Sequence, residues 1–260
     1  MEVLLLKVLL TPSLVLLVSL AQRRWGHLLG GQLTALPLTS GPFVLILACT
    51  EGAEAGRVAV RGILLGTPAV LVSCLVYGLL ARRHGWVVCL STSAFATVAT
   101  SGLVVLLAPP LWCSLAFTAV TLIGVFLAQR RARVVTAPPA GPAWELAARV
   151  VISAVLVGTL SWTAAKVGAG PAGVLATFPA LACVLTAFTH RLDGAAGPIQ
   201  LTRGVLAGVP ATVLFFLCLL GTLTWLPVAL AFGLAGLVVA VAGTLLPRLA
   251  TARRASVMAA

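Results

Sequence analysis

Long apolar runs separated by short polar or charged segments cover almost the whole chain. The first run, from Val3 to Ala21, is followed by Arg23-Arg24, and the turn between the fourth and fifth runs contains Pro109-Pro110. Each run has close to the about 20 residues that a helix needs to cross a bilayer. The pattern predicts an all-α polytopic membrane helix bundle with about nine transmembrane helices, at residues 3–21, 28–50, 58–80, 86–108, 110–128, 144–165, 172–189, 200–222 and 225–246.

Composition identifies the medium that these helices face. Hydrophobic residues make up 61% of the chain, charged residues only 8%, and the mean hydropathy is +1.16. Such a chain has too little polar surface for a water-soluble domain. The formal net charge of +12 could suggest a nucleic-acid partner, but the basic residues stand singly or in small groups between apolar runs and form no basic face. We therefore expect membrane lipids around the protein and no nucleic acid as a partner.

A block of residues occurs twice, 142 positions apart and without a gap. Mostly glycine, proline and charged residues recur at this offset. The corresponding pairs are Gly31 and Gly173, Leu33 and Leu175, Pro37 and Pro179, Glu51 and Asp193, Gly52 and Gly194, Arg61 and Arg203, and Gly62 and Gly204. Self-similarity of this kind is typical of a duplicated structural unit. It predicts a first repeat at residues 1–108, a connecting helix and cytoplasmic linker at 109–143, a second repeat at 144–247 and a cytoplasmic tail at 248–260.

Lysine and arginine predict the orientation. With the N-terminus outside, most of the 17 basic residues fall on the cytoplasmic side, and only Lys7, Arg57, Arg61 and Lys166 fall outside. Basic residues concentrate in cytoplasmic loops, so this orientation is favoured and places the C-terminus in the cytoplasm. Because a fifth helix crosses the membrane between the two four-helix repeats, the repeats have inverted topology, as in many secondary transporters. We expect a multi-pass protein of a bacterial plasma (inner) membrane.

Proline interrupts the corresponding helix of each repeat. Helix 28–50 contains Pro37 and Pro42, and helix 172–189 contains Pro179. An internal proline frees a backbone carbonyl, which in a bilayer must face protein or a water-filled cavity. Paired interrupted helices of this kind indicate a transporter's binding site. In the competing interpretation, the prolines only kink the helices and the glycines only permit close packing. The candidate pathway residues are Gly31, Thr34, Pro37, Gly173, Thr177 and Pro179.

Each repeat also carries a set of three charged residues at matching positions. The first set is Lys7, Glu51 and Arg61, near the predicted outer face, and the second is Arg149, Asp193 and Arg203, near the inner face. One interpretation is that each set is a charge network, which gates a pathway or attracts an anionic solute. The other is that these are interfacial residues whose long side chains reach the head groups. The functional interpretation predicts that each acid bonds a cation of its own set, so that loss of either acid weakens folding.

The sequence contains no Walker motif, dinucleotide fingerprint or Ser-His-Asp arrangement, and no His or Cys spacing suggests a metal site. We therefore expect no enzyme activity and no cofactor. The expected function is that of a permease or exporter of a small solute, with an anion as one candidate. The alternative is a non-transporting membrane protein that assists or anchors a partner. A polar cavity between the two interrupted helices at the midplane favours transport, and a dry, packed interface favours the alternative.

The second repeat resembles a known family. Ala172-Gly173, with Pro179 six positions after the glycine, is followed by His190, Gly194 and Arg203, and this pattern resembles the small four-helix GlpM-like proteins of bacterial inner membranes. Gly30-Gly31, Pro37 and Arg61 form a second, looser match, and the spacing from the proline to the arginine differs from that of the family. Because family members have about half this length, the resemblance implies a fused pair of such units. The family has no established reaction, so the resemblance implies architecture and not activity.

Overall fold

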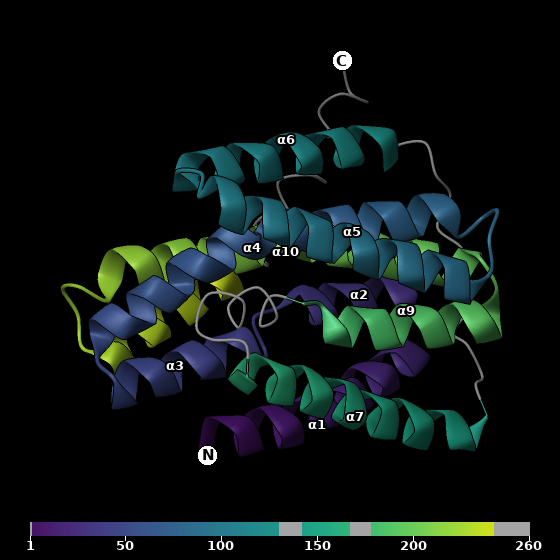
Figure 1. Ribbon diagram of the computed structural model, residues 1–260, viewed down its shortest axis with the longest axis horizontal. Coiled ribbons are helices and arrows are strands. Elements are labelled where there is room, and N and C mark those ends of the chain that lie inside the picture. The colour runs from purple at the N-terminus through teal and green to yellow at the C-terminus, as the bar shows by residue number, and fades with distance from the viewer. Residues whose placement is uncertain (1, 130–141, 167–177, 242–260) are drawn as a thin grey trace, which may run out of the picture.

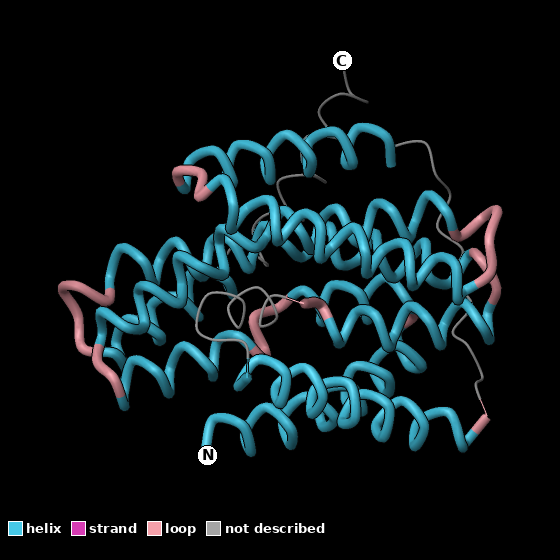
Figure 2. Tube along the Cα trace, viewed as in Figure 1, coloured by secondary structure: helices cyan, strands magenta, loops and turns pink. Residues whose placement is uncertain are grey.

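The computed structural model describes residues 2–129, 142–166 and 178–241, and every regular element within them is a helix (Figures 1 and 2). The helices are α1 (Glu2–Trp25), α2 (His27–Ala35), α3 (Ser40–Thr50), α4 (Ala53–Leu80), α5 (Trp86–Leu107), α6 (Leu111–Gln129), α7 (Ala143–Lys166), α9 (Ala180–Asp193) and α10 (Ala196–Thr222). A further apolar helix covers Val228–Val241. The expectation of an all-α bundle is confirmed.

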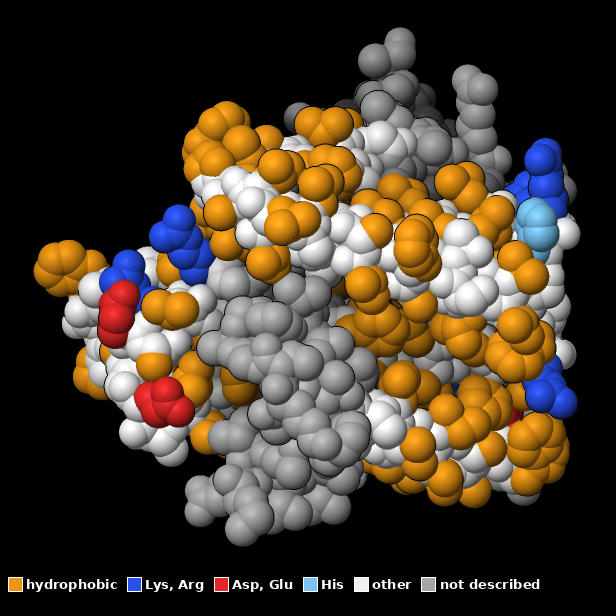
Figure 3. Space-filling model, in the orientation of Figure 1, with side chains coloured by type: hydrophobic (Ala, Val, Ile, Leu, Met, Phe, Trp, Pro, Cys, Tyr) orange, Lys and Arg blue, Asp and Glu red, His pale blue; other side chains and the backbone are white. Residues whose placement is uncertain are grey.

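Several helices have the length and apolar composition of membrane spans. Within the described residues these are the segments 27–50, 53–80, 86–107 and 196–222, which include α2 with α3, α4, α5 and α10. The helices lie roughly along the long axis of the molecule (Figure 1). In Figure 3, the charged side chains visible on this face gather towards the two ends of that axis, and apolar side chains cover much of the surface between them. This distribution is the one that a bilayer requires, because charge is costly in the hydrocarbon core.

The core forms where α10 packs against α2, α3 and α4. One apolar cluster joins Val44 of α3, Leu64 of α4, and Phe216 and Leu219 of α10, all of them almost completely buried. A second cluster joins Leu71 of α4 with residues of α10. The helix α10 therefore connects both predicted repeats, since α2, α3 and α4 belong to the first and α10 to the second.

The contact between α2 and α10 is close enough to bring the two backbones together. A Cβ atom added at Gly31 would lie 2.9 Å from Gly204 Cα, and one added at Gly204 would lie 2.9 Å from Gly31 Cα. One turn further along, a Cβ atom at Gly208 would lie 2.7 Å from the Cβ atom of Ala35. Small residues spaced four apart on facing helices permit this approach in membranes. The α2 and α10 backbones are therefore closely packed at these positions.

Candidate functional site

The predicted second transmembrane helix is two helices in the structure, α2 and α3, separated by Leu36–Thr39. Pro37 lies in this break, where its ring and missing N–H prevent the helix from continuing. Thr212 of α10 donates a hydrogen bond from its hydroxyl to the Ala35 carbonyl at the end of α2. The Pro37 carbonyl accepts a bond from Gly41 N at 2.8 Å, which starts the next helix. The interruption is thus stabilised by a hydrogen bond of its own backbone and by Thr212 of α10.

A cavity of about 320 Å³ lies beside the break. Its described walls come from the break, from α3, from α10 and from the helix Val228–Val241. They are residues 36–38 of the break, Gly41, Pro42 and Leu45 of α3, Phe215 of α10, and Phe232, Gly236 and Val239 of the last described helix. All of these residues are apolar or glycine. The cavity is therefore not the polar one that favours transport, and none of its described walls belongs to α9.

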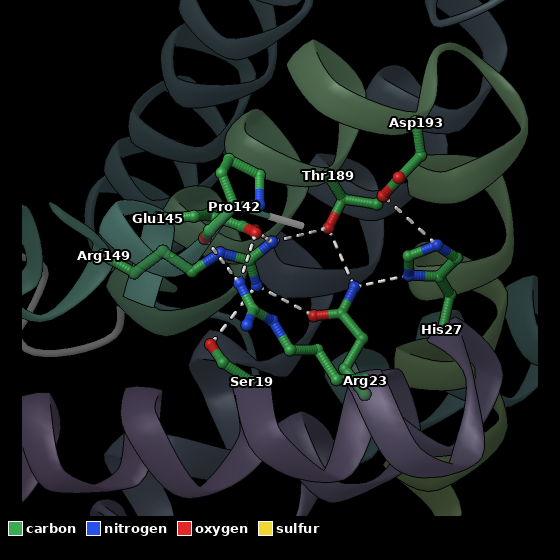
Figure 4. Close-up of polar contacts among 9 residues, drawn as sticks. Ser19, Arg23, His27, Pro142, Glu145, Arg149, Thr189 and Asp193 are labelled. Atoms are coloured by element: carbon green, nitrogen blue, oxygen red, sulfur yellow. Dashed lines mark hydrogen bonds and ion pairs between the residues drawn. The ribbon is translucent and has the colours of Figure 1, made fainter. Parts of the chain in front are cut away.

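A second feature is a buried polar network at one end of the bundle, where α1, α7 and α9 meet (Figure 4). Its charged centre is the guanidinium of Arg149 on α7, which is 3% exposed and forms an ion pair with Glu145 one turn earlier, also 3% exposed. The other oxygen of Glu145 lies 2.8 Å from Nη2 of Arg23 on α1. Arg23 Nη2 also donates to the Pro142 carbonyl at 3.0 Å. One buried carboxylate is thus held between two guanidinium groups, one from α1 and one from α7.

The amide of Gln22 connects this ion pair to α9 and α2. Its oxygen accepts a bond from Arg149 Nη1 at 2.9 Å, and its nitrogen donates to Thr189 Oγ1 at 2.8 Å and to His27 Nδ1. Ser19 Oγ accepts a further bond from Arg149 Nη1 at 3.2 Å. These partners use both the donor and the acceptor capacity of the amide. Because Nδ1 of His27 accepts, its Nε2 carries the proton.

The Nε2 atom of His27 faces the carboxylate of Asp193, 3.4 Å away, at the end of α9. Partial burial raises the pKa of the Asp193 carboxyl above its ordinary value, and the nearby Glu145 adds to the rise, whereas Arg149 lowers it. The Glu145 carboxylate therefore opposes the ionisation of Asp193 across the network. Arg149 Nε is buried and has no hydrogen-bond partner among the described residues. The network is held by strong charge pairs but leaves one donor unsatisfied.

The four candidate pathway residues that the structure describes have different surroundings. Gly31 packs against Gly204, and the hydroxyl of Thr34 donates to the Gly30 carbonyl at 2.7 Å. Pro37 lines the apolar cavity. Pro179 is the N-cap of α9, so the described part of the second interrupted helix also begins directly after its proline. Gly173 and Thr177 lie outside the described residues.

The predicted charge pairs are replaced by others. Asp193 faces His27, and Arg149 pairs with Glu145 instead of Asp193. The physical reason is proximity, because Glu145 lies four residues before Arg149 on the same helix, where side chains are neighbours. Arg203, near Arg82, forms no ion pair with a described residue.

In the first set, Glu51 and Arg61 are exposed and do not pair with each other, and the side chain of Lys7 lies outside the described part. The neighbouring ion pair instead joins Glu54 and Arg57 at 2.9 Å on the surface of α4. Among the described members of the two sets, Arg149 and Asp193 take part in the buried network, whereas Glu51 and Arg61 do not.

Sequence reasoning did not find Ser19, Gln22, His27, Glu145 and Thr189. The spacing of Glu145 and Arg149 was the available signal, since a glutamate four residues before an arginine favours a helical ion pair. The other residues come from three helices and have no pattern of their own in the sequence. No protein-family model, curated protein or solved structure matches this chain.

Proposed function

We propose that this protein is a membrane transporter, a permease or exporter of a small solute, built from two inverted four-helix repeats. The observation that carries the proposal is the break at Pro37 together with the start of α9 directly after Pro179. Interrupted helices at matching places in two halves are where secondary transporters bind their solutes. The pathway would run between the two breaks, and nine spans with a cytoplasmic C-terminus remain part of the proposal.

The helix bounds support the duplication. The offset of 142 residues maps α4 onto residues 195–222, and α10 covers Ala196–Thr222; it maps α3 onto 182–192, which lies within α9. The turns before α4 and α10 agree as well, because Gly52 and Gly194 both have positive φ, at 98° and 66°. Only glycine adopts this conformation without strain.

The directions of equivalent helices support the inverted arrangement. The end of α1 meets the start of α7 at the Arg23–Glu145 pair. The end of α4 lies beside the start of α10, since Tyr77 and Thr202 line the same small cavity. Equivalent helices that run antiparallel are expected for repeats related by an axis in the membrane plane, whereas an axis along the membrane normal would make them parallel.

We further propose that the Arg149 network is a gate on the cytoplasmic side. It connects α1 of the first repeat to α7 and α9 of the second, so opening this end requires that it break. Buried ion pairs contribute little net stability because desolvation offsets their attraction. The unsatisfied Arg149 Nε lowers the stability of the closed arrangement further. The network therefore fixes the geometry of the closed state, while its low net stability allows it to open.

Water access at the break tests the transport proposal. In a variant with the six native cysteines replaced, Thr34→Cys should react with a membrane-impermeant maleimide added to either side of oriented proteoliposomes. Leu237→Cys, which is exposed on the apolar helix Val228–Val241 and does not line the cavity, should stay unlabelled and is the control. Transport is contradicted if Thr34→Cys is protected from both sides.

The alternative function, a non-transporting protein that assists or anchors a partner, has two observations in its favour. The α2–α10 interface is closely packed at Gly31 and Gly204, and the cavity at the break has no polar side chain among its described walls. Protection of Thr34→Cys from both sides would favour this alternative.

A further inference from the structure

The apolar cavity beside the break is large enough for a ligand, and no described residue fills it. Its volume of about 320 Å³ lies at the lower end of the range of about 300–1,000 Å³ found for small-molecule sites. Two of its walls carry glycine, Gly41 and Gly236, where a side chain would otherwise project. No heavy atom lies within 4 Å of a Cβ atom built at Gly236, so space is open beside that residue.

Three backbone carbonyls next to this cavity already have partners. At the break, the Leu36 carbonyl accepts from Leu38 N at 2.7 Å and the Pro37 carbonyl from Gly41 N at 2.8 Å. The Ala35 carbonyl accepts from the Thr212 hydroxyl. Buried water needs two to four polar partners, and no described wall residue offers it a polar side chain. A polar solute meets the same difficulty.

The position of the cavity identifies the chemistry that reaches it. Its walls belong to the spanning segments 27–50 and 196–222 and to the apolar helix Val228–Val241. Molecules that approach from the surroundings of such helices are the hydrocarbon chains of lipids. An empty space of this size would deprive its walls of dispersion contacts, which a flexible chain can restore.

We propose that this cavity is a binding site for an acyl chain of a membrane phospholipid. The chain lies against Pro37 and Leu45 on one side and Phe232 and Val239 on the other, and so packs against the interrupted helix. The site does not depend on transport, because it is defined by packing beside the break. Its failure and the failure of the transport proposal are therefore distinguishable.

Photocrosslinking tests the site. The full chain is reconstituted into phosphatidylcholine vesicles that contain a small fraction of phosphatidylcholine with a diazirine in the middle of one acyl chain, and crosslinks are mapped by peptide mass spectrometry. Crosslinks should be several-fold enriched at residues 36–45 and 232–239 over the exposed apolar surface of α6. Gly236→Leu should remove most of this enrichment by filling the cavity.

Gly233→Leu is the matched control. Gly233 lies on the same helix, is exposed, has no neighbouring atom within 4 Å of a built Cβ, and does not line the cavity. This variant should crosslink like the parent. Val239→Phe fills the cavity from another position and replaces Gly236→Leu if that variant does not fold.

Three outcomes would overturn the proposal: equal crosslinking of all lipid-facing helices, enrichment that both filling variants leave unchanged, or the absence of lipid crosslinks at residues 36–45 and 232–239. If the last outcome occurs together with a large loss of thermal stability in the filling variants, another part of this chain occupies the cavity.

Discussion

Replacing Glu145 by glutamine removes the single negative charge between Arg23 and Arg149. Arg23 Nη2 lies 2.8 Å from the Glu145 carboxylate, and both Glu145 side-chain oxygens face a guanidinium. At an effective dielectric constant of about 20, one pair of charges about 4 Å apart contributes about 4 kcal/mol. Glutamine keeps a hydrogen-bond acceptor but leaves the two guanidinium groups without an anion. We expect a loss of about 3–5 kcal/mol in the free energy of unfolding, the usual cost of breaking a buried pair.

The surface pair Glu54–Arg57 provides a matched control on another helix. Its atoms are 2.9 Å apart, but the Glu54 side chain is 75% exposed. An exposed pair contributes at most about 1 kcal/mol, so Glu54→Gln should change stability by less than that. Denaturant unfolding in detergent micelles, followed by circular dichroism, measures both variants.

The double variant Glu145→Gln with Arg149→Met separates the charge effect from packing. Removing both partners leaves no unpaired Arg149 charge, so it should recover part of the loss. The reasoning is refuted if Glu145→Gln and Glu54→Gln have the same small effect, or if the double variant is less stable than Glu145→Gln alone.

Four further outcomes are expected. Gly204→Ala should cost about 1–3 kcal/mol in the same unfolding assay because its methyl overlaps the α2 backbone, whereas Gly62→Ala, which has open space, should be neutral or slightly stabilising. Thr212→Val should cost about 1–3 kcal/mol by leaving the Ala35 carbonyl without its partner; no loss would show that the bond is absent in solution. The raised pKa of Asp193 means that its contribution to stability is present below the unfolded pKa of about 4 and is lost as pH rises through the higher folded pKa. Asp193→Asn should therefore stabilise the protein at neutral pH and flatten its acid pH profile, and a destabilised variant would contradict this sign. Cys49, exposed at the end of α3, should react with an impermeant maleimide from the outside of intact cells once the other cysteines are replaced; labelling only from the inside would contradict the proposed orientation.

The sequence predicts the helices well because their apolar runs and prolines act locally. Pro37 and Pro179 lie at helix boundaries, which the loss of a backbone donor favours, whereas Pro68 and Pro210 lie inside α4 and α10. The expected pairing of Asp193 did not form, because a partner depends on how helices distant in sequence meet. Gln22 and Arg149 are 127 residues apart and become neighbours only when α1 packs against α7.

The contact between α2 and α10 was not predicted either. Gly31 and Gly204 were recognised as repeated positions, but the offset pairs each with its own copy and not with the other. Their contact follows from the way the two proposed repeats pack together. Equivalence in sequence therefore identified important positions without identifying their neighbours.

The most direct measurement of the central claim is the distance between the ends of α1 and α9 in a membrane. Nitroxide labels at Arg24 and Arg191, both exposed beside the Arg149 network, would be measured by double electron–electron resonance in proteoliposomes. Alternating access predicts two distance populations, a shorter one with the network closed and a longer one that Glu145→Gln enriches. A single distance that is unchanged in Glu145→Gln would contradict the proposal that this network is the gate of a transporter.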